Sequence, residues 1–416
     1  MKKKNKLILV ETEIKGPKGH FLDCLIETSK TFENKLKITW IINKYFSKEK
    51  TYIPNKIKIY KSVTGNYYNR KENKFFYILE KVFLFFENIC QLIFFSFYFY
   101  RKKNFINYLT ALKSNHFTIP KYFKSFYNTY LKLKLSSNDH IFFQSARRND
   151  VALINFLIKL NPNHPKFHIR VFLPPKIRFN SFFYYLKEIK LELINKKVFL
   201  YLFGNYTYKY FIKNCEFKKG IFKSQLPWSF YNRIFKTKNF TIGYVGNARR
   251  SRGFHLLPKI IFELEKKSNS FRYLIQFSNI SADLVDVKYK LYEMAKINNR
   301  IEIIEEYSDY KKFRNILKKI DIMPIIHKSE ELNKITSGTM YSCLTHQIPM
   351  IIPKKTYFMK NLLKHKSYEE ISGNCDFTNS IIKIANNYSN YLKNAKLNSS
   401  FLKQKLRKDP LNINIY

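Results

Sequence analysis

The stretch from Phe240 to Phe254 contains the side chains and the flexible backbone that an anion site requires. Its sequence is FTIGYVGNARRSRGF, with three of the chain's ten glycines and three arginines: Gly243, Gly246, Gly253, Arg249, Arg250 and Arg252. Glycine permits tight turns and close approach of a ligand to the backbone. The forked guanidinium group of arginine matches the oxygens of a phosphate. The chemistry that this pattern predicts is phosphate binding.

A strand, a loop and a helix are expected to position these side chains. The apolar run from Phe240 to Val245 predicts a buried strand, Gly246 opens the loop, and a helix is expected to begin near Phe254. The unpaired N–H groups at a helix N-terminus then face the same space as the arginines, which favours an anion. A basic turn without a ligand is the alternative interpretation.

Strands and helices alternate along most of the chain. Apolar runs predict strands at 7–10, 36–42, 140–143, 167–173, 197–202, 240–245, 273–277, 301–304, 320–324 and 350–352. In the second half, helices are expected at 255–266, 284–296, 309–319 and 338–346. This alternation predicts an α/β fold with a mostly parallel sheet in each half. We expect two Rossmann-like domains that face a central cleft, 1–235 and 236–416, joined by a polar linker that ends near Lys238.

The segment from about 66 to 135 departs from this alternation. It is rich in aromatic and basic residues, and its uncharged run at 88–100 is shorter than the roughly 20 residues that cross a bilayer. A helical insertion is therefore expected. Its basic flanks suit contact with anionic lipid, and an internal helix with basic ends is the equal alternative.

Composition limits the classes of function. The net charge of +46 invites a nucleic-acid or membrane partner, but the lysines are spread along the chain among many asparagines, isoleucines and tyrosines, as in AT-rich coding. Five cysteines without a CxxC pair argue against a zinc site or a disulfide scaffold. The start, MKKKNKLILVETE, is typical of a first strand rather than a signal peptide. We expect a cytoplasmic protein with no metal site.

Further candidates stand where strands and helices are expected to end. A glycine loop follows the first strand, a histidine follows the strand that ends at Pro324, and a hydroxyl-rich turn precedes the helix at 338–346. These residues are Gly16, Gly19, His20, His327, Ser337, Gly338 and Thr339. For the histidines, a structural role is the alternative, and for Ser337 or Thr339 it is ordinary helix capping.

Several motifs together resemble one enzyme family. GYVGNARRSRGFHLLPKII, DIMPI and the SGT of TSGTMYSCLTHQIPMIIP are similar to the donor-binding domain of retaining GT-B glycosyltransferases of the bacterial surface-polysaccharide type (glycosyl transferases group 1, family 4-like). GPKGHFLDCLIETSKTF is similar to the glycine loop and first helix of their acceptor-side domain. The resemblance covers most of the chain in order and is weakest at about 45–135.

The resemblance implies transfer of a sugar, hexosyltransferase-like, from a nucleotide-diphosphate donor to a glycan or lipid-linked acceptor in polysaccharide synthesis. It implies a retaining reaction without metal or cofactor, and an enzyme that can work at the inner face of a membrane. Arg252 stands where the family has a lysine that contacts the donor diphosphate. Asn247 stands where the family has a second basic residue, which Arg249 or Arg250 would replace. The remaining donor-side candidates are Gly246, Gly253, His327, Ser337, Gly338 and Thr339; Gly16, Gly19 and His20 are on the acceptor side.

Two positions depart from the family pattern. An acidic pair that normally flanks the SGT loop is replaced by Lys334 and Ser342, and Glu330 and Glu331 lie a few residues upstream. A catalytically degenerate GT-B scaffold protein is therefore an alternative to an enzyme. A basic nucleic-acid-binding protein is the other alternative, although the sequence contains no recognisable nucleic-acid-binding module.

Overall fold

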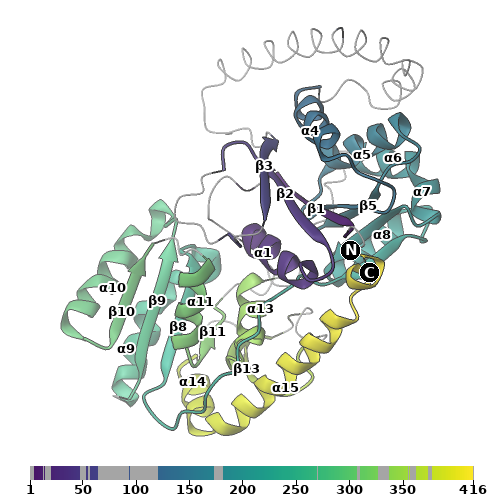
Figure 1. Ribbon diagram of the computed structural model, residues 1–416. Helices are drawn as coiled ribbons and strands as arrows, with labels where there is room; N and C mark the ends of the chain where they lie inside the picture. The colour runs from purple at the N-terminus through teal and green to yellow at the C-terminus, as the bar shows by residue number, and fades with distance from the viewer. Residues whose placement is uncertain are drawn as a thin grey trace. The chain divides into compact units, whose positions relative to one another are not determined.

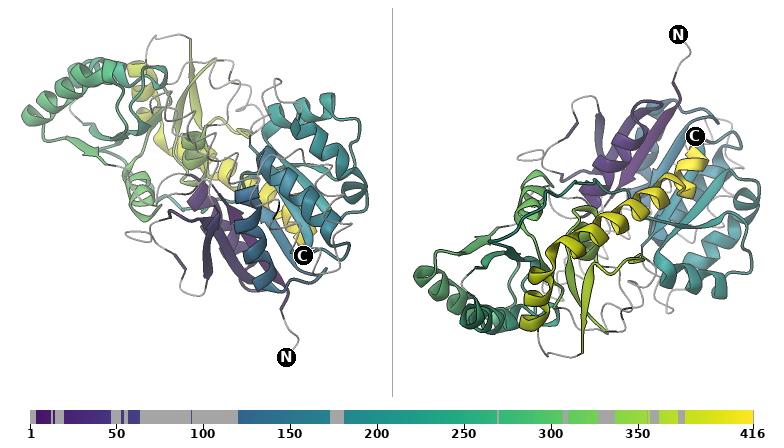
Figure 2. Two further views of the ribbon diagram at one scale, coloured as in Figure 1. Left: turned by 90° about the horizontal axis from the view of Figure 1, so that it is seen from above. Right: turned by 90° about the horizontal axis from the view of Figure 1, so that it is seen from below.

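The computed structural model describes residues 4–12, 14, 20–46, 53–54, 57–63, 93, 120–172, 181–268, 270–306, 310–326, 337–354, 356, 362–372 and 377–415. The chain divides into two compact units (Figures 1 and 2). Unit 1 comprises Met1–Leu226 and Pro410–Tyr416, and unit 2 comprises Pro227–Asp409. Most of the insertion expected at 66–135 lies outside the described residues. Its described end forms helix α4, Pro120–Leu133.

A seven-stranded parallel sheet forms the centre of unit 1, in the order β3-β2-β1-β4-β5-β6-β7. Its strands are β1 (Lys6–Glu11), β2 (Lys37–Asn43), β3 (Lys58–Val63), β4 (His140–Phe143), β5 (Lys166–Val171), β6 (Val198–Phe203) and β7 (Ile221–Ser224). The central strands are nearly continuous apolar runs because helices cover both faces of the sheet. The strand order reverses between β1 and β4, and in such sheets the carboxyl ends of the two strands at the reversal are where ligands bind.

Two sets of helices cover this sheet. Apolar residues of α4 to α8 form one core with strand residues such as Ile8 and Ile141. On the other face, Trp40 Nε1 in β2 donates to Ser29 Oγ in α1 at 2.9 Å, and Asn414 Nδ2 in α16 donates to Tyr201 OH in β6 at 3.1 Å. The remaining helices of this unit are α1 (His20–Phe32), α5 (Arg148–Leu160), α6 (Ser181–Glu188), α7 (Lys190–Ile194), α8 (Gly204–Asn214) and α16 (Pro410–Ile415).

Unit 2 contains two three-stranded parallel sheets that join along one strand pair. The strands are β8 (Thr241–Asn247), β9 (Arg272–Ser278), β10 (Ile301–Glu305), β11 (Met323–Pro324), β12 (Met350–Pro353) and β13 (Tyr368–Ile371). The orders are β10-β9-β8 and β11-β12-β13, and Gly243 N in β8 donates to Ile322 O beside β11 at 3.0 Å. A Cβ at Gly243 would lie 2.5 Å from the Ile320 side chain, so this close join requires glycine.

The helices of unit 2 agree with the expected alternation between 240 and 352. They are α9 (Leu257–Lys267), α10 (Val285–Ile297), α11 (Tyr310–Lys319), α13 (Gly338–Thr345), α14 (Phe377–Asn386) and α15 (Tyr388–Arg407). Apolar residues of α9, α10, α14 and α15 pack into one core with β8 and β9. The right-hand view of Figure 2 shows α15 as the long yellow helix, after which the chain returns to unit 1 in α16.

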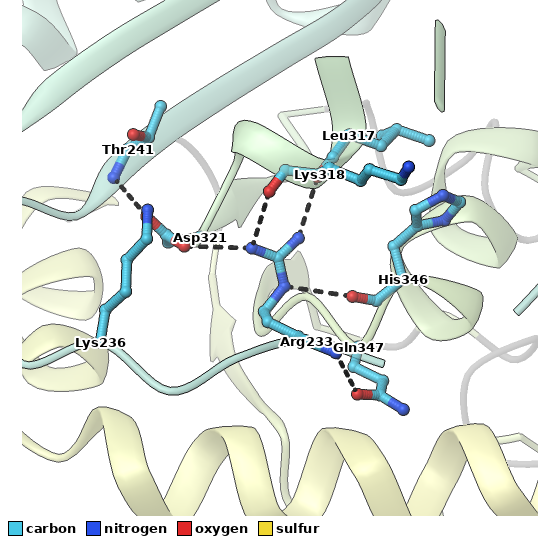
Figure 3. Close-up of polar contacts among 8 residues, drawn as sticks. All are labelled: Arg233, Lys236, Thr241, Leu317, Lys318, Asp321, His346 and Gln347. Carbon is cyan, nitrogen blue, oxygen red and sulfur yellow. Dashed lines mark hydrogen bonds and ion pairs between the residues drawn. The ribbon is translucent and has the colours of Figure 1, made fainter. Parts of the chain in front are cut away.

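The boundary between the units lies at Leu226/Pro227, earlier than the expected 235/236. Contacts of the irregular segment after Pro227 bind it to unit 2, among them those of one buried arginine. Arg233 Nη1 donates to Asp321 Oδ1 at 3.0 Å, Nη2 to Leu317 O at 2.9 Å, and Nε to His346 O at 3.1 Å (Figure 3). Asp321 also accepts from Lys236 Nζ at 3.0 Å. The arginine and aspartate side chains are 3% and 0% exposed.

We expect Arg233→Ala to lower the free energy of unfolding of unit 2 by about 3–5 kcal/mol, because it leaves the Asp321 carboxylate buried without its main partner. Lys236→Ala is the matched control: its side chain is 45% exposed, so the loss should be at most about 1 kcal/mol. Trp40 and Trp228 are the only tryptophans, one in each unit, so urea unfolding in a Trp40→Phe background follows unit 2 alone. Equal losses for the two variants would contradict this role of Arg233.

Unit 1 buries two neighbouring histidines in the sheet, His140 and His168. His140 Nδ1 lies 2.9 Å from His168 Nε2, and His168 Nδ1 lies 3.0 Å from Tyr201 OH. Burial, together with the charge of Lys166, lowers the pKa of His140 to about 4. Burial and the neighbouring His140 hold the pKa of His168 well below its ordinary value. Both rings therefore remain uncharged at neutral pH.

These lowered pKa values predict that unit 1 loses stability as the pH falls. An unfolded histidine takes up a proton near pH 6.5, whereas folded His140 does so only near pH 4, so stability is complete above pH 6.5 and declines toward pH 4. Replacing His140 with phenylalanine should remove about 1.4 kcal/mol per pH unit from this slope. Urea unfolding at several pH values, followed by Trp40 in a Trp228→Phe background, measures it. An unchanged slope would show that the pKa of His140 is not lowered by folding.

Candidate functional site

The carboxyl end of β8 is held in an unusual backbone conformation. Gly246 has φ +123°, a value that side chains rarely allow. Its N–H donates to Gln276 Oε1 of the neighbouring strand at 3.2 Å, and Gln276 Nε2 donates to Glu306 O at 2.8 Å. Tyr244 OH donates to Asn247 O at 3.1 Å. These bonds fix the strand end from which the arginine loop departs.

The segment after β8 differs from the expected strand, loop and helix. Two 3-10 turns, Arg250–Arg252 and Phe254–Leu256, precede α9, which begins at Leu257 rather than near Phe254. Gly253 separates the turns with φ +73°, and a Cβ there would lie 2.3 Å from Ile326 O. The left-handed glycine and its close packing interrupt the helix. The Phe254–Leu256 turn runs directly into α9, so the helical segment begins at Phe254 and the arginines of the first turn immediately precede it.

Arg252 lies directly against the backbone of Gly246. A Cβ on Gly246 would be 3.0 Å from Arg252 Nη1. Among the described residues, the half-buried guanidinium of Arg252 makes no hydrogen bond or ion pair. Burial raises the pKa of Tyr244, and the positive charge of Arg252 opposes that rise, which places the guanidinium beside this ring. The arrangement places the guanidinium of Arg252 between the Gly246 backbone and the Tyr244 ring.

The other two arginines of the loop are both exposed, and they differ in their partners. Arg250 Nε donates to Asp283 Oδ2 at 3.0 Å, and the pKa of Asp283 is lowered because Ser281 and Arg250 donate to it. For Arg249, within the described chain, only backbone bonds are found: its carbonyl accepts from Arg252 N at 3.0 Å. Arg250 is thus paired with Asp283, whereas no side-chain partner of Arg249 is found among the described residues.

Two polar residues that the sequence did not single out shape the site. Besides Gln276, Ser278 Oγ donates to Asn247 Oδ1 at 3.1 Å, so the Asn247 amide is fixed to β9. The only available signal was a pair of polar residues, Gln276 and Ser278, in the otherwise apolar strand RYLIQFS.

Helix α13 presents its N-terminus to the same edge of the unit 2 sheet. It connects β11 to β12, a parallel pair, so it starts at the carboxyl edge of the strands, where β8 also ends. Ser337 Oγ accepts from Met340 N at 3.4 Å, so its hydroxyl caps the helix, while Gly338 and Thr339 form the first turn. Ser342, the position at which the resemblance implies a glutamate, is only 3% exposed.

Several candidates fall outside what can be placed. Gly16, Gly19, His327 and Lys334 lie outside the described residues, and His20 is described only as the first residue of α1. In the part of the chain that is described, no group of three or more histidine, cysteine, aspartate or glutamate side chains could hold a metal ion. The described helices include none that is long and apolar enough to cross a membrane.

Solved structures of similar architecture match nearly the whole chain. A glycosyltransferase from Rickettsia africae covers 99% of this chain and 98% of its own, at 12% identity and a TM-score of 0.56. HepE from Anabaena, solved with UDP and glucose, covers 99% of this chain and 97% of its own, at 10% identity and a TM-score of 0.54. Sucrose-phosphate synthase from Thermosynechococcus elongatus covers 96% of this chain and 95% of its own, at 10% identity and a TM-score of 0.54. The chain therefore has the GT-B fold, as the sequence predicted. No protein-family model and no curated protein sequence matches it.

We expect Gly253→Ala to destabilise unit 2 by about 1–3 kcal/mol or more, because a side chain there is strained by the backbone and collides with Ile326. Ser251→Ala, in the same turn, is the matched control and should change stability by less than about 0.5 kcal/mol. Urea unfolding followed by Trp228 measures both. A stable Gly253→Ala variant would mean that the loop can move away from Ile326.

Proposed function

We propose that this GT-B protein transfers a sugar from a nucleotide-diphosphate donor, and that the donor diphosphate binds at the Gly246–Gly253 loop of unit 2. One observation carries the proposal: the Arg252 guanidinium is held against the bare backbone of Gly246 at the carboxyl edge of a parallel sheet. Ligands of such sheets bind at that edge. An arginine there has the shape and charge to bind two phosphate oxygens.

The same arrangement suits the chemistry of transfer. As the bond between the sugar and the diphosphate breaks, negative charge develops on the leaving phosphate oxygens. Donors already fixed in place stabilise that charge without reorganising, which is commonly the largest contribution to catalysis. In the proposal, Arg252 supplies this stabilisation, Arg249 assists it, and the N–H groups at the start of α13 face the diphosphate. The proposed reaction is retaining. It needs no metal, because the arginine side chains supply the positive charge that stabilises the leaving diphosphate.

The similar structures support a uridine nucleotide as the first donor to test. HepE was solved with UDP, with UDP and glucose, and with UDP-glucose. We further propose a glycan or lipid-linked acceptor of bacterial surface-polysaccharide synthesis, and peripheral work at the inner face of the membrane. The high positive charge of the chain is compatible with that location.

A second candidate function is a GT-B scaffold protein that binds nucleotide without turnover. The buried position of Ser342 favours it, because a serine enclosed at 3% exposure offers no carboxylate to the sugar or ribose. Nucleotide binding is common to the two candidates, and sugar release from the donor distinguishes them.

Thermal unfolding with UDP, GDP, ADP, CMP or no ligand tests donor binding. A nucleotide at a hundred times its dissociation constant adds about 2.7 kcal/mol, which shifts the melting temperature by several degrees. We expect a shift with one diphosphate that Arg252→Ala abolishes. Arg250→Ala is the matched control, since Arg250 is paired with Asp283, and it should keep most of the shift. No shift with any nucleotide, in folded wild-type protein, would refute the donor site.

Turnover then separates the enzyme from the scaffold. The readout is release of the nucleoside diphosphate from the donor sugar that binds, with and without EDTA. The enzyme should release it at the same rate with the chelator, and Arg252→Ala should reduce that rate by about 10²–10³-fold while remaining folded. Binding without release would favour the scaffold, and loss of turnover in EDTA would overturn metal independence.

A further inference from the structure

Helix α15 carries exposed positive charge with no acidic residue near it in the sequence. Residues 377–408 include seven lysines and arginines but no aspartate or glutamate. Five of the seven are exposed on α15 and its C-cap, and we call them the basic stripe: Lys393, Lys396, Lys403, Arg407 and Lys408. The first four are spaced by three, seven and four residues, which places them on one face of the helix. At a rise of 1.5 Å per residue, the stripe is about 20 Å long.

Other exposed lysines of unit 2 are paired with carboxylates. On α9, α10 and α11 the ion pairs are Lys266–Glu263, Lys296–Glu293, Lys312–Glu306 and Lys319–Glu302. In the basic stripe, by contrast, no side chain forms an ion pair with any residue that the structure describes. Lysine is common throughout the chain, so the distinguishing feature of α15 is the lack of carboxylates. The opposite face of the helix packs into the unit 2 core through Tyr391 and Leu392.

An irregular segment with two exposed apolar side chains lies beside α15. Lys403 Nζ is 5.9 Å from the centre of the Phe230 ring, and the Phe235 ring is 6.3 Å from the ring of Tyr388, the first residue of α15. The segment between these contacts therefore runs along the helix. In it, Ile234 is 78% exposed and Phe235 is 49% exposed.

The position of these apolar side chains is fixed by the residue before them. Arg233 is buried and bound to Asp321 and to carbonyl groups of α11 and α13, so the backbone at Ile234 cannot fold inward without breaking that network. A third apolar side chain, Leu397, is 42% exposed within the basic stripe. The surface therefore combines unpaired cations with aliphatic groups held in solvent.

This combination matches an anionic lipid bilayer. Cations attract the phosphates of lipid headgroups, and apolar side chains enter the boundary between headgroups and acyl chains. A single-stranded nucleic acid is bound by cations together with aromatic rings that stack on its bases. Here Ile234 and Leu397 are aliphatic, and Phe235 already packs against Tyr388. The aliphatic groups favour the bilayer over the nucleic acid.

We propose that the basic stripe and the neighbouring Ile234 and Phe235 bind the surface of an anionic lipid bilayer. The inference rests on the proposed work at the inner face of a membrane and deepens it, because it assigns a contact surface to unit 2. The sequence had suggested only the flanks of the insertion at 66–135. The surface includes no residue of the Gly246–Gly253 loop, so bilayer binding and nucleotide binding are separable.

Sedimentation with vesicles tests the charged part of the surface. The vesicles are phosphatidylcholine alone and phosphatidylcholine mixed with phosphatidylglycerol, at low and high salt. We expect wild-type protein to bind the mixed vesicles at low salt. A variant that combines Lys393→Gln, Lys396→Gln, Lys403→Gln and Arg407→Gln should bind them at least about a hundredfold more weakly, because each cation near the surface contributes about fivefold.

The matched control removes the same net charge elsewhere on unit 2. It combines Lys266→Gln, Lys296→Gln, Lys312→Gln and Lys319→Gln, whose side chains are 57%, 69%, 60% and 58% exposed. Because charges beyond about 10 Å are largely screened, this variant should bind within about threefold of the wild type. Equal binding by the two four-site variants would show that only the overall charge matters, and the inference would be overturned.

The apolar part of the surface distinguishes a bilayer from other polyanions. Ile234→Asn should weaken binding to the mixed vesicles about three- to tenfold, because less apolar surface leaves water. Ile297→Asn is the matched control: Ile297 is 89% exposed at the end of α10 and should not contribute. Wild-type affinity for vesicles in Ile234→Asn, or tighter binding of the wild type to RNA or polyphosphate than to mixed vesicles, would overturn the inference.

Failure of the proposed function gives a different result. If the basic stripe binds vesicles but no nucleotide shifts the melting temperature, the donor proposal falls and the bilayer surface stands. If a nucleotide shifts the melting temperature but the wild type does not bind mixed vesicles, the bilayer surface falls and the donor site stands. The stripe variant should keep the wild-type nucleotide shift, which also shows that it is folded.

Discussion

Close contact of bare glycine backbone with its neighbours is the constraint on which the β8 segment depends. Gly243 lets the strand meet Ile320, Gly253 lets the loop meet Ile326, and Gly246 leaves room for the Arg252 guanidinium. A Cβ at any of these positions would approach another atom to 3.0 Å or less. In a chain with only ten glycines, three are used to bring one strand and one loop into contact range. The position of the proposed diphosphate site follows from that packing.

A buried charge network supports unit 2 at a different place. The irregular segment after Pro227 pairs with no strand. Arg233 binds it to the C-terminal ends of α11 and α13 through their backbone carbonyls, and to the side chain of Asp321. Carbonyls at helix C-termini carry partial negative charge, which a buried arginine complements. The network explains why this segment belongs to unit 2, even though its composition is that of a linker.

The sequence by itself determined the alternation of strands and helices, the α/β fold and the concentration of glycine and arginine in the loop after β8. These depend on local properties: apolar periodicity, glycine spacing and the charge of neighbouring residues. Only the tertiary structure decided that two 3-10 turns precede α9, that Arg252 rests on Gly246 while Arg250 pairs with Asp283, and that Arg233 binds Asp321. Each of these is set by contacts made on folding, several between residues far apart in the chain, and local sequence patterns do not encode them.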